Sequence, residues 1–234
     1  MKYTVFMDIK QVINPFGPIF YQEETTSTML MAKEQPQLGG LYLTNYQNLP
    51  QARVAGRTWF AGKGLNLTFT LALANNFNDP PSLLCGLAVS NLLNDLGISN
   101  TIKWPNDILV NDKKICGILC RLEDNLLHIG IGLNVNEMNF PADINATSLA
   151  LETGRKLNRE DLLNRLLNRL QLTLTNPDWL TAINRRLWRR GQKVNYQVSG
   201  GQISGLITNI AGDGALVLKL ADGSLYNLYA GEAE

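Results

Sequence analysis

The chain has 234 residues, and its 21 lysines and arginines nearly balance its 20 aspartates and glutamates, which leaves a formal charge of +1. Such a balance provides no long-range field to attract a polyanion, so the composition predicts no nucleic-acid partner. A chain of this size buries roughly 70% of its unfolded surface, which is enough for one substantial core and a small second domain.

Cysteine content and hydropathy indicate the compartment. The three cysteines, Cys85, Cys116 and Cys120, lie within apolar runs, and their odd number does not suit a disulfide framework. We therefore expect small buried thiols in a reducing compartment. No uncharged apolar stretch reaches the ~18 residues of a membrane span, so we expect a cytoplasmic protein with no membrane partner.

A cluster of hydroxyl side chains, Thr25-Thr26-Ser27-Thr28, precedes the run from Met29 to Lys33. Hydroxyls are favoured at helix starts because they accept hydrogen bonds from the free backbone N–H groups there. The pattern predicts a helix start, and capping alone accounts for at least one of these hydroxyls.

A polar, basic, glycine-containing loop follows from Gln47 to Trp59, and Gly62-Lys63-Gly64 leads from it into an apolar run. Arginine side chains in such a loop can clamp phosphate oxygens with two parallel hydrogen bonds. A solvated surface loop explains these residues equally well, so the loop by itself leaves both interpretations open.

Apolar periodicity predicts two helices and three strands. Asp79-Pro80-Pro81 is a strong helix start, and leucines at helical spacing continue to Leu96 before Gly97 ends the run. Asn158 can cap a second helix, whose apolar face consists of leucines between residues 162 and 170. Short apolar runs predict strands of one sheet at residues 66–73, 115–122 and 126–133.

The most specific run is Lys103-Trp104-Pro105-Asn106-Asp107, followed after a short strand and a polar turn by Lys113-Lys114. It clusters a lysine, an amide and a carboxylate around a loop that the proline stiffens. Taken alone, the run is also typical of a capped turn with an aromatic side chain packed on it.

Glycines alternate with apolar residues in Gly130-Ile131-Gly132-Leu133-Asn134. One face of that strand then lacks side chains, so a flat ligand can lie directly on the backbone. Close packing of a helix on the strand explains the same pattern. The run is not a dinucleotide fingerprint, because the GxGxxG spacing is missing.

The C-terminal region has a different sequence pattern from the rest of the chain. An amphipathic, basic stretch from Asp178 to Arg190 ends at Gly191, and the β-rich runs after it are separated by glycine pairs and by Asp-Gly turns. We therefore place a boundary near residue 190, between a main domain at residues 1–190 and a small β-barrel at residues 191–234.

Taken together, the separated segments resemble one family, the biotin protein ligases or holocarboxylase synthetases. They occur in the family's order: TSTM at 26–29, GRTW at 56–59 with GLNL at 64–67, KWPND at 103–107 with KKICGIL at 113–119, and GIGLNVN at 130–136. The resemblance covers about Glu23 to Gly231. It implies an α+β fold of the class II synthetase-like, biotin–lipoate ligase type: a mixed central sheet flanked by helices, with an SH3-like small β-barrel at the C-terminus.

The resemblance implies a role for each matching residue. Ser27 and Thr28 would hydrogen-bond the ureido ring of biotin, with Gln47 on its other side. Lys114 would bridge the biotin carboxylate and the α-phosphate, assisted by Arg57 and by Asp107, which would also hold the metal. The remaining implied contacts are Arg53, Gly56, Trp59, Gly117, Gly130 and Gly132 to substrate, and Lys103, Asn106 and Asn134 to nucleotide.

One departure concerns the arginine-glycine loop. The family has GRGRxGRxW, whereas only Gly56-Arg57-Thr58-Trp59 matches cleanly here, and counting back from Trp59 puts Val54 at the position of an arginine. Either a one-residue shift restores Arg53 to that position or the contact is lost. The same shift decides whether Gln47 or Asn48 faces biotin.

The resemblance also implies the reaction and its partners. The enzyme would use ATP and Mg²⁺ to activate biotin as biotinyl-AMP and would transfer it to a lysine of the biotin carboxyl carrier protein of acetyl-CoA carboxylase. Only about two dozen residues precede the TSTM segment, so we expect the short form without a DNA-binding domain. We expect a monomer or a homodimer.

Three alternatives remain beside this interpretation. A lipoate ligase or octanoyltransferase shares the fold, but its RRxxGGG-like segment is missing here. A non-catalytic biotin-binding sensor would keep the pocket and lose turnover through its altered loop. An RNA-binding tail built from Arg185, Arg186, Arg189 and Arg190 is less favoured, because such a charge run is usually a solvated helix face.

Overall fold

A seven-stranded mixed sheet forms the centre of the computed structural model, which describes residues 7–53 and 59–233. The strand order is β1-β2-β3-β7-β6-β5-β4, and only the β1–β2 pair is parallel. The strands are β1 Ile19–Thr25, β2 Leu41–Gln47, β3 Leu67–Ala74, β4 Thr101–Lys103, β5 Asp107–Val110, β6 Lys113–Glu123 and β7 Leu126–Leu133.

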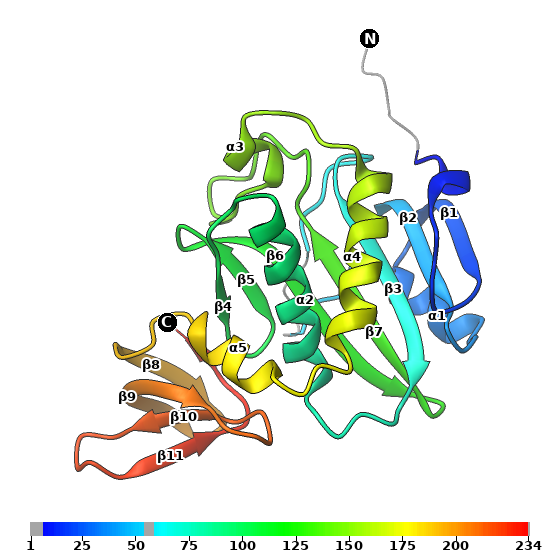
Figure 1. Cartoon of the computed structure of the whole chain (residues 1–234). Helices are drawn as coiled ribbons and strands as arrows, with labels where there is room; N and C mark the ends of the chain where they lie inside the picture. The colour runs from blue at the N-terminus through cyan, green and yellow to red at the C-terminus, as the bar shows by residue number, and fades with distance from the viewer. Residues whose placement is uncertain (1–6, 54–58, 234) are drawn as a thin grey trace.

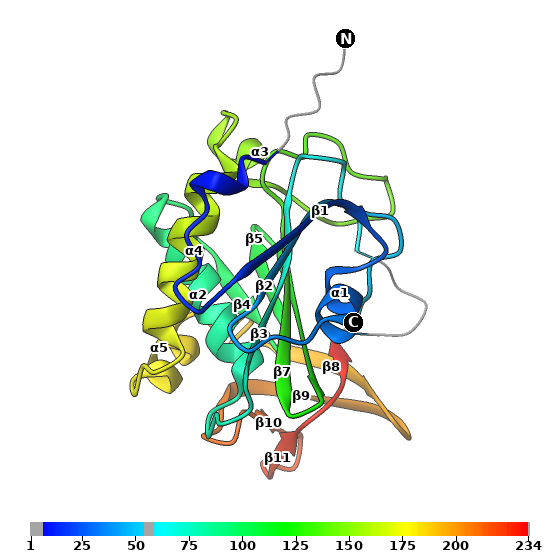
Figure 2. The same ribbon diagram turned by 90° about the vertical axis from the view of Figure 1, so that its right-hand side faces the viewer.

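Helices cover the two faces of this sheet unequally. The long helices α2 (Pro81–Asp95) and α4 (Arg159–Thr173) lie on one face with α5 (Trp179–Arg185), while α1 (Thr28–Glu34) lies on the other, as Figures 1 and 2 show. The short α3 (Leu149–Thr153) and the 3₁₀ turn η1 (Ile9–Gln11) lie at the periphery. The large core is therefore on the α2/α4 side, and α1 is the helix of the described chain that packs on the opposite face.

Local signals in the sequence explain several element boundaries. Asn158 caps α4 by accepting a hydrogen bond from the Asp161 backbone N–H at 2.7 Å. Two tight hairpins join β5 to β6 and β6 to β7, and each has two consecutive residues with positive φ: Asn111-Asp112 and Asp124-Asn125. Such turns match the twist of paired strands, so they fix the order of β5, β6 and β7 locally.

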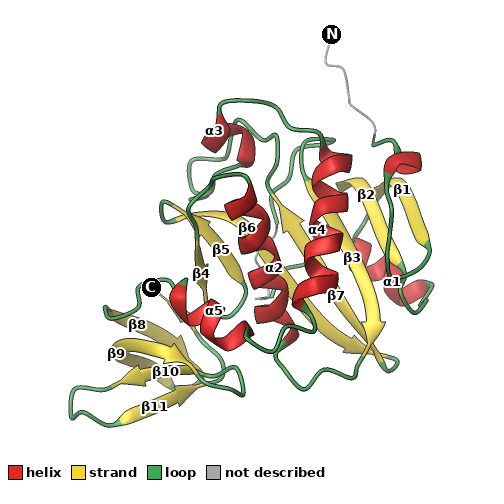
Figure 3. Ribbon diagram, in the orientation of Figure 1, coloured by secondary structure: helices red, strands yellow, loops and turns green. Residues whose placement is uncertain are grey.

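The C-terminal residues form a second, smaller sheet of five antiparallel strands in the order β11-β10-β9-β8-β12. Figure 3 shows strands β8 to β11 of this sheet. The strands are β8 Lys193–Val198, β9 Gly201–Ile210, β10 Leu216–Lys219, β11 Leu225–Leu228 and β12 Glu232–Ala233. The predicted α+β fold is confirmed, with its mixed sheet, flanking helices and small C-terminal β unit.

The two sheets are joined by packing and by hydrogen bonds. One continuous cluster of buried apolar side chains includes residues of both. The Trp104 indole N–H donates to the Gly214 carbonyl at 3.0 Å, and the Asn184 side chain exchanges two hydrogen bonds with the backbone of Ile210. The domain boundary that we place near residue 190 stays a prediction, and these contacts argue against independent folding of the small sheet.

The basic stretch before this boundary differs from the expected pattern. The helix α5 ends at Arg185 instead of continuing toward Gly191. The chain leaves the helix because it pairs with β4: the Ile102 N–H donates to the Arg186 carbonyl at 2.8 Å, and the Trp188 N–H donates to the Ile102 carbonyl at 3.0 Å.

The three predicted strands and two predicted helices are confirmed with small shifts at their ends. Cys85 and Cys116 are buried free thiols, as expected, and Cys120 is a partly buried one. Within residues 7–53 and 59–233, no helix combines the length and the apolar character that crossing a bilayer requires.

Candidate functional site

A cavity of about 150 Å³ opens on the α1 side of the large sheet, between β3, β6, β7, the segment before residue 54 and the last strand β12. Eleven of the residues singled out from the sequence line it: Ser27, Thr28, Gln47, Arg53, Trp59, Asn106, Asp107, Lys114, Gly117, Gly130 and Gly132. These residues come from six separate stretches of the chain, so the fold brings together what the motifs keep apart.

Hydroxyl and amide groups gather at one end of the cavity, around the first turn of α1. Ser27 caps this helix by accepting from the Met29 backbone N–H at 3.2 Å. The side-chain oxygen Oε1 of Gln47 accepts from the Thr28 backbone N–H at 2.8 Å and from its hydroxyl at 3.2 Å. Thr70 donates its hydroxyl to that of Thr28 at 2.9 Å. Gln47, and not Asn48, is therefore the amide side chain that lines the cavity.

Three glycines form the floor. Gly117 of β6 and Gly132 of β7 are direct partners in the sheet, and Gly130 lies two residues along β7. The Trp59 indole lies on this backbone, because a Cβ atom added at Gly132 would be 2.5 Å from its ring. Over Gly130, the Met29 sulfur of α1 would be 3.0 Å from such an atom. A side chain of α1 thus packs on Gly130, in line with the close-packing interpretation, while a ligand on this backbone stays a prediction.

A β-bulge directs Lys114 into the cavity. Ile108 of β5 pairs with Cys116, but the next residue, Leu109, pairs with Lys114, so Ile115 is an extra residue in β6. Strict alternation would put Lys114 on the same face as Cys116 and Ile118, which is the face toward α2. The extra residue turns it to the opposite face instead.

The Lys114 ammonium is already paired with a carboxylate. Its Nζ lies 2.7 Å from Asp107 Oδ1 and 5.7 Å from the centre of the Trp59 ring. Lys114 and Asp107 are both partly buried, so their attraction is screened less than that of a fully exposed pair. A cation and a carboxylate thus lie at the charged end of the cavity, at the edge of the glycine floor.

Asn106 both lines the cavity and braces its wall. Its side-chain Nδ2 donates to the Ile118 carbonyl at 2.8 Å, and its own carbonyl accepts from the Ile118 N–H at 2.9 Å. These bonds fix the loop between β4 and β5 against β6.

The C-terminal strand closes one side of the cavity, which sequence patterns do not predict. Glu232 of β12 lines the cavity, and its Oε1 lies 2.7 Å from Arg53 Nη2. Gln51, two residues before Arg53, accepts a hydrogen bond at 2.5 Å from Arg121 of β6. No motif signals Glu232, Gln51 or Arg121, because each acts through a partner distant in the chain.

Four of the predicted site residues do not join this group. Gly56 and Arg57 lie outside the described residues. Lys103 is not among the described residues that line the cavity. Its Nζ lies 4.9 Å from the centre of the Trp188 ring, and burial lowers the pKa of Lys103. Asn134 is also absent from it, and its Nδ2 donates to the Thr147 carbonyl at 3.0 Å, which braces the end of β7.

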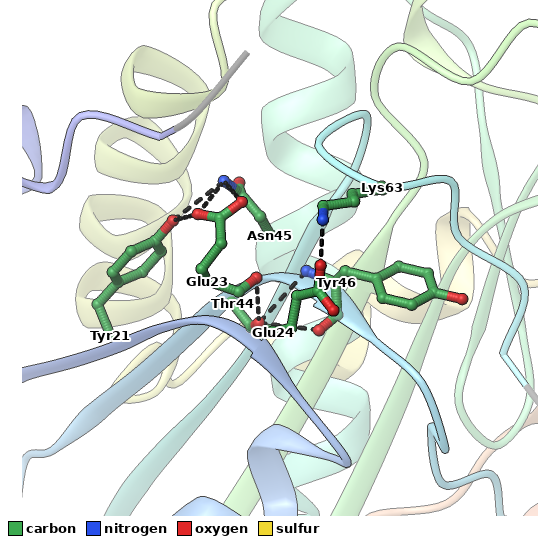
Figure 4. A network of polar contacts seen from close by, with 7 residues as sticks. All are labelled: Tyr21, Glu23, Glu24, Thr44, Asn45, Tyr46 and Lys63. Atoms are coloured by element: carbon green, nitrogen blue, oxygen red, sulfur yellow. Dashed lines mark hydrogen bonds and ion pairs between the residues drawn. The ribbon is translucent and has the colours of Figure 1, made fainter. Parts of the chain in front are cut away.

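The chain after Trp59 is fastened to the main sheet. The carboxylate of Glu137, a buried residue, accepts from the Gly62 N–H at 2.8 Å and from the Asn66 amide at 3.3 Å. Figure 4 shows Lys63 paired with Glu24 of β1, next to a second group in which Glu23 contacts Tyr21 and Asn45. Burial is the main cause that raises the pKa of Tyr21 above its usual range, and the hydrogen bond with Glu23 is the second.

Two other features have structural roles in the described chain. His128 is buried in β7, and this burial lowers its pKa. The predicted basic run is used internally: Arg186 donates to Ser90 and Asn91, Arg190 donates to the Thr208 carbonyl, and Arg189 lies over the Trp188 ring. Three of the four arginines of the run thus have partners within the described chain.

Comparison with known proteins identifies similar molecules. The model of the biotin/lipoate A/B protein ligase family matches residues 20–136, and that of the biotin protein ligase C-terminal domain matches residues 191–234. The chain is 29% identical to the bifunctional ligase/repressor BirA of Bacillus spizizenii, over 92% of this chain and 73% of that protein.

Two further similarities extend to a mycobacterial relative and to a solved structure. The chain is 32% identical to the biotin–[acetyl-CoA-carboxylase] ligase of Mycobacterium tuberculosis, over 59% of this chain and 56% of that protein. Its structure resembles that of the biotin protein ligase from Aquifex aeolicus in complex with biotin and ATP, with a TM-score of 0.85 and 26% identity. That likeness covers 94% of this chain and 98% of the other.

Proposed function

The chain belongs to the biotin/lipoate A/B protein ligase family, and from this premise we propose that it is an ATP-dependent biotin protein ligase. The enzyme activates biotin as biotinyl-AMP and transfers it to a lysine of a biotin carboxyl carrier protein. The observation that carries the proposal is the cavity itself, in which a hydroxyl and amide end, a glycine floor and a charged end follow one another.

The two ends of the cavity suit the two ends of biotin. Ser27, Thr28 and Gln47 offer donors and acceptors for a cyclic urea, which both donates and accepts hydrogen bonds. At the other end, Lys114 can meet the carboxylate. The uncharged floor between them suits the apolar chain of the acid.

The first step brings two anions together. A biotin carboxylate oxygen bonds to the α-phosphorus of ATP, and the bond from that phosphorus to the bridging oxygen of pyrophosphate breaks. Cations that already point at the developing charge lower this barrier. Lys114 lines the cavity and can supply one such cation, and Arg53 is the second described cation at its wall. Lys114 must then exchange Asp107 for the substrates.

Asp107 also fits a role in holding magnesium. Mg²⁺ binds through one or two carboxylates together with substrate phosphates rather than in a cage of protein ligands. Asp107 lines the cavity and can supply one such carboxylate. Bound through Asp107 and the phosphates, the ion would screen the phosphate charge.

The second step transfers biotin to the carrier. The carrier lysine has an ordinary pKa near ~10.4 and must lose a proton before its nitrogen attacks the acyl carbon, which releases AMP. Asp107 can accept that proton once Lys114 has exchanged its partner. The Trp59 ring on the glycine floor is placed to keep water from the adenylate.

One assay tests the whole proposal. Labelled biotin, ATP, Mg²⁺ and a carrier domain are mixed with the protein, and biotin-dependent exchange between pyrophosphate and ATP is followed in parallel. We expect exchange with biotin and a labelled carrier. Exchange with lipoate or octanoate alone would indicate a lipoate-type enzyme, and biotin binding without any exchange would indicate a sensor.

The setting of the reaction belongs to the same proposal. We place the enzyme in the cytoplasm, where its three free cysteines suit reducing conditions. Its acceptor would be the carrier protein of acetyl-CoA carboxylase, and it would act as a monomer or a homodimer.

A further inference from the structure

The small C-terminal sheet contributes a carboxylate to the cavity of the large sheet. Glu232 pairs in β12 with Gln197 of β8, which fixes its backbone within the small sheet. Its side chain reaches across to Arg53, at 2.7 Å between Oε1 and Nη2, and both side chains are about one-third exposed. Arg53 also donates to the Gly231 carbonyl at 3.4 Å. The arginine is thus held by the last strand of the chain.

Both described cations that line the cavity face carboxylates in this arrangement. Lys114 is paired with Asp107, and Arg53 is paired with Glu232. An anion that enters the cavity therefore has to exchange with a carboxylate rather than bind to a waiting cation. Carboxylate and phosphate oxygens both accept hydrogen bonds from a guanidinium, so a phosphate oxygen can take the place of Glu232 Oε1 at Arg53 Nη2.

We infer that Glu232 is an internal substitute for a phosphate group: it occupies Arg53 in the free enzyme, and ATP binding transfers Arg53 from Glu232 to the triphosphate. The inference rests on the proposed function, because it assigns the competing ligand as nucleotide. Glu232 is then a positioning residue that acts through Arg53 and sets the selectivity for polyphosphate.

The exchange selects for highly charged ligands. A triphosphate offers several oxygens and more negative charge than a single carboxylate, so it displaces Glu232, whereas a monoanion gains little from the exchange. When pyrophosphate leaves, Glu232 recovers Arg53 and draws the segment at residues 51–53 back to β12. Release of pyrophosphate and closure of the wall are thereby coupled.

The test replaces Glu232 by glutamine, which keeps the shape and removes the charge. We expect the Kd of Glu232→Gln for α,β-methylene-ATP, measured by calorimetry, to fall about two- to fivefold, as expected for a partly exposed ion pair. Affinity for biotin should not change. In an Arg53→Gln background, the same substitution should lower the Kd for nucleotide clearly less than it does in the wild type, because Arg53 is the group through which we propose that Glu232 acts.

Asp95→Asn is the matched control, since Asp95 forms a surface pair with Arg169 at 2.6 Å between groups of similar exposure. It should leave both affinities unaltered. An unchanged or raised Kd for nucleotide in Glu232→Gln would overturn the inference. So would an equal decrease in the Arg53→Gln background, which would reveal a general charge effect. A wild-type protein that makes no biotinyl-AMP would instead refute the proposed function.

Discussion

The floor and the charged rim of the cavity are built in different ways. The floor consists of glycine backbone in neighbouring strands, and its geometry follows from the register between β6 and β7. The rim consists of side chains held by ion pairs, one within a hairpin and one between residues 53 and 232. A floor of paired backbone is rigid and selects ligands by shape, whereas paired side chains can change partners and so serve chemistry.

The largest effect is expected at the rim. Lys114→Ala should lower the rate of biotinyl-adenylate formation by about 10²–10³-fold or more, because it removes the cation at which the charge develops. The fold should persist, since the side chain lies in the cavity rather than in the core. Exchange between pyrophosphate and ATP measures the loss, and Lys113→Ala, at the exposed neighbour, is the control. Adenylate production near the normal rate would remove Lys114 from its assigned role.

The floor is tested by adding bulk. Gly132→Val should raise the KM for biotin by more than about tenfold, because overpacking on this scale costs roughly 1–3 kcal/mol. A Cβ atom there would be 2.5 Å from the Trp59 ring. Gly86→Ala in α2 is the control, since its Cβ would be 3.5 Å from the Ile108 side chain, which is an ordinary contact. Unchanged biotin affinity in Gly132→Val would show that β7 is not the floor.

The segment that follows Trp59 holds this residue against the glycine floor and is itself anchored by Glu137. Glu137→Leu should lower the free energy of unfolding by about 1–3 kcal/mol, because it leaves the Gly62 N–H without its carboxylate. Glu137→Gln keeps an acceptor oxygen, so it should lower the free energy of unfolding by less than Glu137→Leu does. Urea titration measures both changes. Equal stability of the leucine variant and the wild type would mean that this anchor is dispensable.

The smallest expected effect is the pH dependence of stability that the buried His128 of β7 contributes. Burial lowers the pKa of His128, with Glu123 and Asp124 opposing the change and Lys33 adding to it. The unfolded chain therefore takes up the proton first, and stability is lost as pH falls below the unfolded pKa of ~6.5. Between pH 6.5 and 5.5 the loss from this group should be at most about 1.4 kcal/mol. His128→Leu should remove that part of the pH dependence in urea titrations, and an identical dependence in both proteins would contradict the assignment.

Much of the fold follows from local signals. The caps at Ser27 and Asn158 and the apolar periods of α2 and α4 were sufficient to place these helices. The end of α5 at Arg185 has no local signal, because Arg186 and Trp188 leave the helix to bond with Ile102 of β4. Such a contact depends on a strand about eighty residues earlier, and no local pattern reports it.

The residues of the candidate site also differ in how far local sequence signals predict them. The alternating glycines, the hydroxyl cluster and the KWPND run are local in sequence, and eleven residues chosen from such motifs line one cavity. Lys103 and Asn134 belong to the same motifs, yet they lie outside its described lining. Membership of a motif identifies a segment, whereas the direction of each side chain depends on what packs around that segment.

The sequence by itself determined the order of the elements, the glycine floor and the family resemblance, because backbone preferences and side-chain periodicity act over a few residues. Only the tertiary structure decided that Lys114 points into the cavity and that Glu232 holds Arg53. The first depends on a bulge in the pairing of β5 with β6, and the second on the packing of the small sheet against the large one. Strand register and long-range packing are collective properties, so they emerge only when the whole chain is folded.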